Sequence, residues 1–159
     1  MKEPSTPTKA TSIKDSPTRA QLEKNTDRIG ILLVDDEQDV IDIFTIELKK
    51  YGYNVDGLSD AKAAIKHFEA DPSKYSLVVS DIKMPQMNGF EFIREIRKIN
   101  STIPVLFITA FEINVSEFSK VLPSTKIDGF IQKPITPGKL AELIRRHLMF
   151  PLPREYNAS

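Results

Sequence analysis

The chain contains no cysteine and only two histidines, which excludes several classes of functional site. Without cysteine it can form no disulfide framework, thiolate zinc site or cysteine nucleophile. His67 and His147 fall in what read as separate helices, so a histidine-rich metal site is also excluded. The 22 basic residues balance the 22 acidic ones, so neither a basic nucleic-acid-binding face nor an acidic tail dominates the chain.

Long hydrophobic runs are absent as well. Apolar runs such as 31–34 and 105–108 are far shorter than the ~20 residues that a membrane-spanning helix needs. The N-terminus lacks the apolar segment of a signal peptide and mixes acids with bases, unlike a transit peptide. We therefore expect a cytoplasmic protein that binds neither membranes nor nucleic acid directly.

The composition changes along the chain. Eleven of the first 28 residues are Ser, Thr or Pro, and few are apolar, so this stretch cannot bury enough surface to offset the entropy of ordering it. Pro151 and Pro153 end any helix near the other terminus. We expect a flexible tail over 1–27, one domain over 28–149, and a C-terminal tail over 150–159 that is too short for an output domain.

Within 28–149, short apolar runs typical of strands alternate with helical stripes of apolar residues. Strands are expected over 29–34, 53–58, 76–81, 103–109 and 128–132, and a weakly amphipathic helix over 113–122. The clearer helical stripes are Val40, Ile43, Phe44 and Leu48; Ala61, Ala64, Ile65 and Phe68, with Asp60 as N-cap; Phe92, Ile93 and Ile96; and Leu140, Leu143, Ile144 and Leu148. Five strands alternating with five helices predict a doubly wound α/β domain with a parallel sheet.

Polar residues come directly after four of the apolar strands. Asp35 and Asp36 follow the first strand, Asp81 ends the third, Thr109 ends the fourth, and Lys133 follows the fifth. Ligands in such sheets bind beyond the carboxyl ends of the strands, so these groups are expected to share one pocket. Each has an ordinary explanation when taken singly, but three clustered acids would repel one another without a cation. Hard carboxylate oxygens suit Mg²⁺.

At this point the sequence resembles the receiver domain of two-component response regulators, over roughly 29–149. The resemblance rests on four motifs in order: Ile31-Leu32-Leu33-Val34-Asp35-Asp36-Glu37; Val79-Ser80-Asp81-Ile82-Lys83-Met84-Pro85 with Asn88-Gly89; Phe107-Ile108-Thr109-Ala110; and Phe130-Ile131-Gln132-Lys133-Pro134. Any one of these motifs is weak evidence, whereas all four at these spacings are specific. The resemblance implies a flavodoxin-like strand order, 2-1-3-4-5.

The resemblance also implies roles for individual residues. Asp81 would be the phosphoacceptor. Mg²⁺ would be held by Asp81, by Asp36 directly, by Asp35 largely through water, and by the backbone carbonyl of Lys83. Lys133 would pair with the phosphoryl oxygens.

Two further positions match the switch residues of the family. Thr109 would supply the hydroxyl that moves to the phosphoryl group, and Phe130 would be the switch aromatic, where the family often has tyrosine. The implied function is a stand-alone phosphoacceptor switch and not an enzyme. It would be phosphorylated by a sensor histidine kinase and would bind an unknown downstream protein.

Three alternatives remain open on the sequence. The chain could be a phosphorelay intermediate that passes phosphate to a histidine phosphotransfer protein. A phosphatase of the haloacid dehalogenase type would need Asp-x-Asp after the first strand, whereas here Asp35 and Asp36 are adjacent and Glu37 fills the second slot. A nucleotide-binding flavodoxin-like or Rossmann protein would need a Gly-rich or hydroxyl-rich first loop, and the acidic loop here would repel phosphate.

Overall fold

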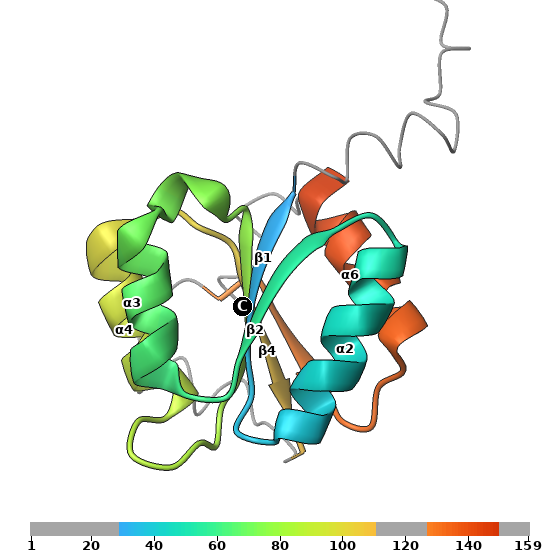
Figure 1. The fold of residues 1–159 in the computed structure, drawn as a ribbon, viewed down its shortest axis with the longest axis horizontal. Coiled ribbons are helices and arrows are strands. Elements are labelled where there is room, and N and C mark those ends of the chain that lie inside the picture. The colour runs from blue at the N-terminus through green and yellow to red at the C-terminus, as the bar shows by residue number, and fades with distance from the viewer. Residues whose placement is uncertain (1–28, 111–126, 150–159) are drawn as a thin grey trace, which may run out of the picture.

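The computed structural model describes residues 29–110 and 127–149, in which parallel strands alternate with helices (Figure 1). The strands are β1 (Gly30–Val34), β2 (Asn54–Leu58), β3 (Leu77–Asp81), β4 (Val105–Thr109) and β5 (Gly129–Gln132). The helices are α2 (Gln38–Lys50), α3 (Ala61–Ala70), α4 (Gly89–Ile99) and α6 (Pro137–Met149), with a short 3-10 helix, η1 (Pro72–Lys74).

The five strands form one parallel sheet in the order β2-β1-β3-β4-β5, so the expected fold class and strand order are confirmed. α3 and α4 cover one face of the sheet, and α2 and α6 cover the other (Figure 1). The helix expected over 113–122 lies outside the described residues. β4 begins at Val105 and not at the expected residue 103, since Pro104 has no N–H to give to a ladder. The Pro104 carbonyl still accepts a hydrogen bond from the Val78 N–H.

The strands are buried on both faces, which explains their continuous apolar sequences. Alternate residues of a strand point to opposite faces. Leu32 and Val34 of β1 therefore belong to the core under α3 and α4, whereas Ile31 and Leu33 belong to the core under α2 and α6.

No helix within 29–110 or 127–149 has both the length and the apolar character needed to cross a membrane.

The buried face of α2 differs from the expected stripe. Ile41 is 2% exposed and packs with Phe44 and Leu48, whereas the expected core residue Ile43 is 56% exposed. Both stripes share Phe44 and Leu48, so helical periodicity alone could not choose between the two isoleucines. Gly57 of β2 lets α2 approach the sheet on the observed side, because a Cβ there would lie 2.7 Å from Ile41.

The other described helices follow the sequence pattern more closely. Asp60 caps α3 as expected, since its carboxylate accepts hydrogen bonds from the N–H groups of Lys62 and Ala63. In α6 the buried residues are Leu140, Ala141 and Ile144, and the expected core residues Leu143 and Leu148 are only partly buried. Ala141 belongs to the core under α2 and α6, and Leu148 packs against the edge of that core.

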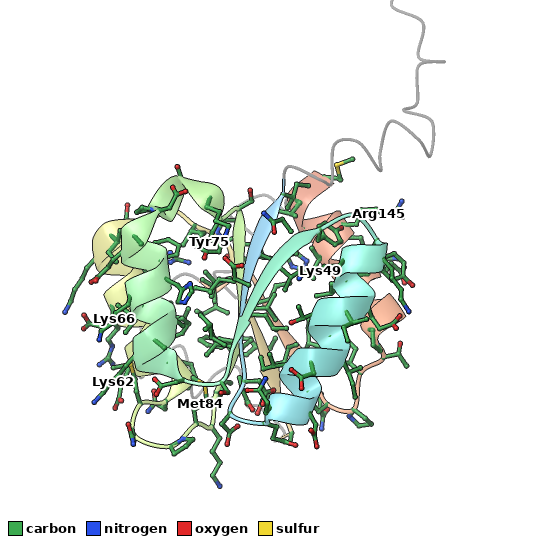
Figure 2. All side chains as sticks on the ribbon, viewed as in Figure 1. Lys49, Lys62, Lys66, Tyr75, Met84 and Arg145 are labelled. Atoms are coloured by element: carbon green, nitrogen blue, oxygen red, sulfur yellow. The ribbon has the colours of Figure 1, made fainter. Side chains whose placement is uncertain are left out.

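A polar cluster ties the edge strand β2 to the loop before β3. The Tyr75 hydroxyl donates a hydrogen bond of 2.5 Å to Asp56, and Lys74 forms an ion pair of 2.8 Å with the same carboxylate. Burial raises the pKa of Asp56, but the hydrogen bonds from Lys74 and Tyr75 outweigh burial and bring that pKa below its ordinary value. Figure 2 shows Tyr75 near one end of the strands and Met84 at the other. This cluster is therefore remote from the carboxyl ends of the strands.

Candidate functional site

The predicted polar residues gather at the carboxyl edge of the sheet, at the bottom of Figure 1. Asp35 follows β1 and is 3% exposed, and Asp81 is the last residue of β3 and is 7% exposed. Asp36 is exposed beside them. One carboxylate oxygen from each of the three lies within 4.8 Å of the others. Three acids at this spacing form the cluster that the sequence predicted.

Backbone hydrogen bonds orient the two buried carboxylates. The Glu37 N–H donates to Asp35 Oδ1 at 2.9 Å, and the Ile82 N–H donates to Asp81 Oδ1 at 2.7 Å. In both aspartates the second oxygen, Oδ2, is therefore turned toward Lys133. Such short turns form readily because an Asp side chain can reach the N–H one or two residues further along.

Lys133 supplies the positive charge of the site. Its Nζ lies 2.7 Å from Asp35 Oδ2, 3.2 Å from Asp81 Oδ2 and 3.9 Å from Glu37 Oε1. Burial lowers the pKa of Lys133, but Asp35 and Asp81 outweigh burial and the net shift is upward. Burial and the charge of Asp35 raise the pKa of Asp81 more than Lys133 lowers it. The site thus holds more negative charge than one ammonium group can compensate.

The acidic cluster opens into a cavity of about 460 Å³. Its lining residues are Asp36, Glu37, Asp81, Lys83, Met84, Pro85, Ala110 and Lys133. This volume has room for a hydrated cation together with a phosphoryl group. The three clustered carboxylates form the hard oxygen donor set that Mg²⁺ prefers, so these residues fit that ion.

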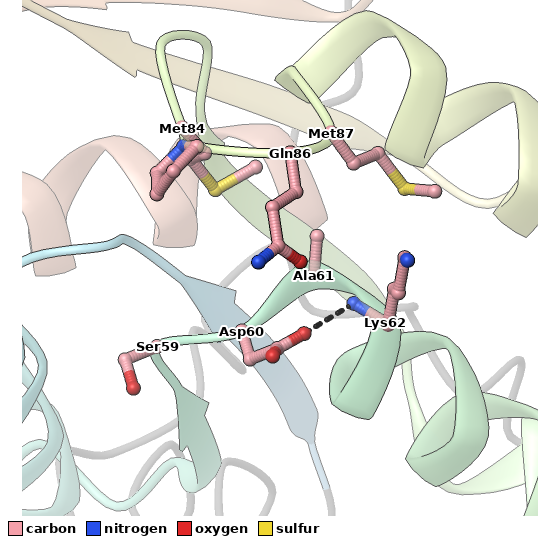
Figure 3. Close-up of a pocket in the computed structure, with 8 residues that line it drawn as sticks. Ser59, Asp60, Ala61, Lys62, Met84, Gln86 and Met87 are labelled. Atoms are coloured by element: carbon pink, nitrogen blue, oxygen red, sulfur yellow. Dashed lines mark hydrogen bonds between the residues drawn. The ribbon is translucent and has the colours of Figure 1, made fainter.

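A second, smaller cavity of about 80 Å³ shares the Met84-Pro85 wall with the first (Figure 3). Its acidic lining residue, Asp60, already caps α3 through the Lys62 N–H. Two methionines, Met84 and Met87, supply much of the remaining wall. Its single carboxylate is therefore already used as a helix cap, and it lacks the cluster of three acids found at the first cavity.

Thr109 ends β4 next to Ala110 of the acidic cavity, and Phe130 lies in the neighbouring strand β5. Thr109 is buried at the end of β4, directly before Ala110, and its carbonyl accepts a hydrogen bond of 2.7 Å from the Lys133 N–H. The register pairs Phe107 with Phe130, and the two rings stack with centroids 5.7 Å apart. Phe107 also meets Phe90 of α4 edge to face at 5.1 Å. The sequence singled out Thr109 and Phe130 as candidate switch residues but not the contact between Phe107 and Phe130, since the register between β4 and β5 was unknown.

The model of the response regulator receiver domain family matches residues 31–145. The chain belongs to this family. The receiver domain is a phosphoacceptor switch and not an enzyme, and receiver domains interact with histidine kinases.

Curated relatives and solved structures agree with the family. The chain is 33% identical over 111 residues to the alkaline phosphatase synthesis transcriptional regulatory protein PhoP of Bacillus subtilis, covering 69% of this chain and 44% of that protein. It is 32% identical over 111 residues to the response regulator SaeR of Staphylococcus aureus, covering 69% and 46%. The chain thus spans less than half the length of these relatives.

Among solved structures, a CheY-like receiver domain protein from Methanospirillum hungatei has a TM-score of 0.68 at 27% identity, covering 82% of this chain and 98% of that one. The receiver domain of the hybrid histidine kinase CckA has a TM-score of 0.63 at 29% identity, covering 75% and 98%.

Proposed function

We propose that Asp81 accepts a phosphoryl group from the phosphohistidine of a sensor histidine kinase, in a reaction that requires Mg²⁺. The observation that carries this proposal is the position of the Asp81 carboxylate, buried against Lys133 and open to the acidic cavity. An Asp81 oxygen attacks phosphorus, the bond from phosphorus to the imidazole nitrogen breaks, and an acyl phosphate forms. The main barrier is repulsion between the carboxylate and the anionic phosphoryl group.

The residues of the site reduce this repulsion. Lys133, 3.2 Å from Asp81 Oδ2, can pair with a phosphoryl oxygen once the phosphoryl group is transferred. We assign Asp36, Asp81 and the Lys83 carbonyl as direct Mg²⁺ ligands and Asp35 as a ligand acting largely through water. When bound, Mg²⁺ would neutralise charge on the equatorial phosphoryl oxygens.

The proposed output is a change of shape that a partner protein recognises. Phosphorylation adds charge beside Thr109, whose hydroxyl would move to the phosphoryl oxygens. The stacked ring of Phe130 would then shift toward the space beside Thr109 and alter the surface near β5 and α6. We propose that residues 28–149 do this as one unit, that 1–27 and 150–159 are tails, and that the downstream target is a protein.

The test is phosphorylation by a small-molecule phosphodonor with Mg²⁺. Asp81→Asn should abolish the acid-labile adduct, whereas Asp39→Asn, an exposed acid in the first turn of α2, should leave it unchanged. Equal phosphorylation of the Asp81→Asn variant would contradict the assignment.

A phosphorelay intermediate is the second candidate, favoured by the similarity to the receiver domain of a hybrid histidine kinase. Transfer of the phosphoryl group from Asp81 to a histidine phosphotransfer protein in a mixture of the two would select it over a terminal switch.

A further inference from the structure

Ser80, next to Asp81 in β3, has a buried hydroxyl on the face of the sheet that α3 and α4 cover. The residue is 0% exposed, and it lies between Val34 of β1 and Phe107 of β4 in the sheet register. Both of these neighbours belong to the core under α3 and α4. A hydroxyl in such surroundings must be hydrogen-bonded to avoid a large desolvation cost. Its Oγ donates a hydrogen bond of 2.8 Å to the backbone carbonyl of Asp81.

That carbonyl belongs to the same peptide unit as the N–H that orients the acceptor. The Asp81 C=O and the Ile82 N–H lie in one plane because the peptide bond is rigid. The oxygen of this unit is held by Ser80, and its N–H donates to Asp81 Oδ1 at 2.7 Å. Fixing one end of the plane therefore fixes the direction of the other.

Helix α4 closes over the same peptide unit. A Cβ on Gly89 would lie 2.3 Å from the Asp81 carbonyl oxygen and 2.9 Å from Ile82 Cα, so only glycine permits this approach. The Gly89 N–H also donates to the Ile82 carbonyl at 2.7 Å. The peptide plane after Asp81 is thus held by a hydrogen bond on one side and by backbone packing on another.

We propose that Ser80 is a positioning residue for phosphoryl acceptance, acting through the Asp81–Ile82 peptide unit on the Asp81 carboxylate. With this plane fixed, Oδ1 is held by the Ile82 N–H and Oδ2 is presented to Lys133 and to the cavity. Without the Ser80 hydroxyl the plane loses one of its two restraints and keeps only the packing against Gly89, so the carboxylate and the Lys83 carbonyl that follows are less firmly aligned. This inference rests on the proposed function of Asp81.

A matched pair of substitutions isolates the hydroxyl. Ser80→Thr keeps the O–H and adds a methyl group, whereas Ser80→Val has the same shape as threonine and lacks the O–H. Loss of one net hydrogen bond corresponds to a change of roughly 2- to 10-fold in an equilibrium or rate constant. Compared with Ser80→Thr, we expect Ser80→Val to bind Mg²⁺ with roughly 2- to 10-fold lower affinity. We also expect its rate of phosphorylation to be roughly 2- to 10-fold lower. Ser73→Ala, which removes an exposed hydroxyl bonded to Asp71, is the control and should match the wild type.

The measurements are calorimetric titration with Mg²⁺ alone, the rate of acceptance from a small-molecule phosphodonor, and amide hydrogen exchange of Ile82 in the metal-free protein. Faster exchange at Ile82 in Ser80→Val than in Ser80→Thr, together with the weaker Mg²⁺ binding, would support the proposal. Equal Mg²⁺ affinity and equal Ile82 exchange in the two variants would overturn it and leave Ser80 as a packing residue.

The same experiments separate this inference from the proposed function. If the wild-type protein neither binds Mg²⁺ nor accepts phosphate, the proposed function fails. The exchange rate of Ile82 still reports whether Ser80 holds the peptide plane, because that measurement needs neither metal nor phosphate. If the wild type is active and the two Ser80 variants behave alike, only the role of Ser80 fails.

Discussion

Replacing Lys133 by methionine would leave two buried carboxylates without their cation. The Lys133 Nζ lies 2.7 Å from Asp35 and 3.2 Å from Asp81, and the side chains of these aspartates are only 4% and 9% exposed. Removing one partner of a buried ion pair lowers the free energy of unfolding by ~3–5 kcal/mol. Because the Lys133 side chain is itself 18% exposed, we expect the lower end, about 3 kcal/mol. This is a large part of the ~5–15 kcal/mol that stabilises a typical domain.

The assay is urea unfolding of wild type and Lys133→Met, with a chelator and then with saturating Mg²⁺. A bound cation stabilises the folded state by RT ln(1 + [L]/Kd), or ~2.7 kcal/mol at a hundred times Kd. Mg²⁺ should bind the more negative variant site more tightly, so the difference in free energy of unfolding should narrow when Mg²⁺ is added. Lys139→Met, which breaks an exposed pair with Glu142, is the control and should cost under ~1 kcal/mol.

Two results would refute this reasoning. If Lys133→Met is no less stable than Lys139→Met in the chelator, Lys133 does not compensate the buried charge. If the difference between Lys133→Met and wild type is the same with and without Mg²⁺, the carboxylates do not form a cation site.

Three further predictions concern the metal, the switch and the edge strand. Asp36→Ala should weaken Mg²⁺ binding more than Asp35→Ala, because we assign Asp36 as the direct ligand; calorimetric titration showing no loss in either variant would contradict the metal site. Thr109→Ala should still be phosphorylated, but a phosphate mimic should shift the amide resonances around Phe130 much less than in wild type; a full wild-type shift would exclude this coupling. Because the folded-state pKa of Asp56 is lowered, its carboxylate stabilises the fold above the usual aspartate pKa of ~3.9. The stability advantage of wild type over Asp56→Asn in urea unfolding should therefore disappear as the pH falls through the folded pKa, and a difference independent of pH would contradict the ion pair.

The polar groups at the carboxyl edge of the sheet were predictable from the sequence because a short stretch of residues is enough to mark the end of each strand. An apolar run ended by a charged residue marks the end of a buried strand, and parallel strands bring such ends to one edge. Asp35, Asp81 and Lys133 could therefore be placed together before any distance was known. The distances, and hence the pairing of Lys133 with both aspartates, required the structure.

The face of α2 was not predictable in the same way. Isoleucine occurs at positions 41, 43 and 46, so apolar residues surround much of the helix and periodicity does not identify one face. The close approach of Gly57 selects Ile41 and leaves Ile43 and Ile46 exposed. Contact between elements distant in sequence decided the outcome, and no pattern within the helix contains that information.

Side chains alternate along β3, so the last two residues of this strand lie on opposite faces of the sheet. Ser80 and Asp81 are neighbours, so they face opposite sides of the sheet. Asp81 faces Lys133 and the charged cavity, while Ser80 shares a row of the sheet with Phe107 and Phe130. A change in charge at Asp81 is therefore one residue away from a row of packed side chains that ends at β5. The two aromatic rings of that row stack, so the row that begins beside the acceptor in β3 reaches Phe130 in β5.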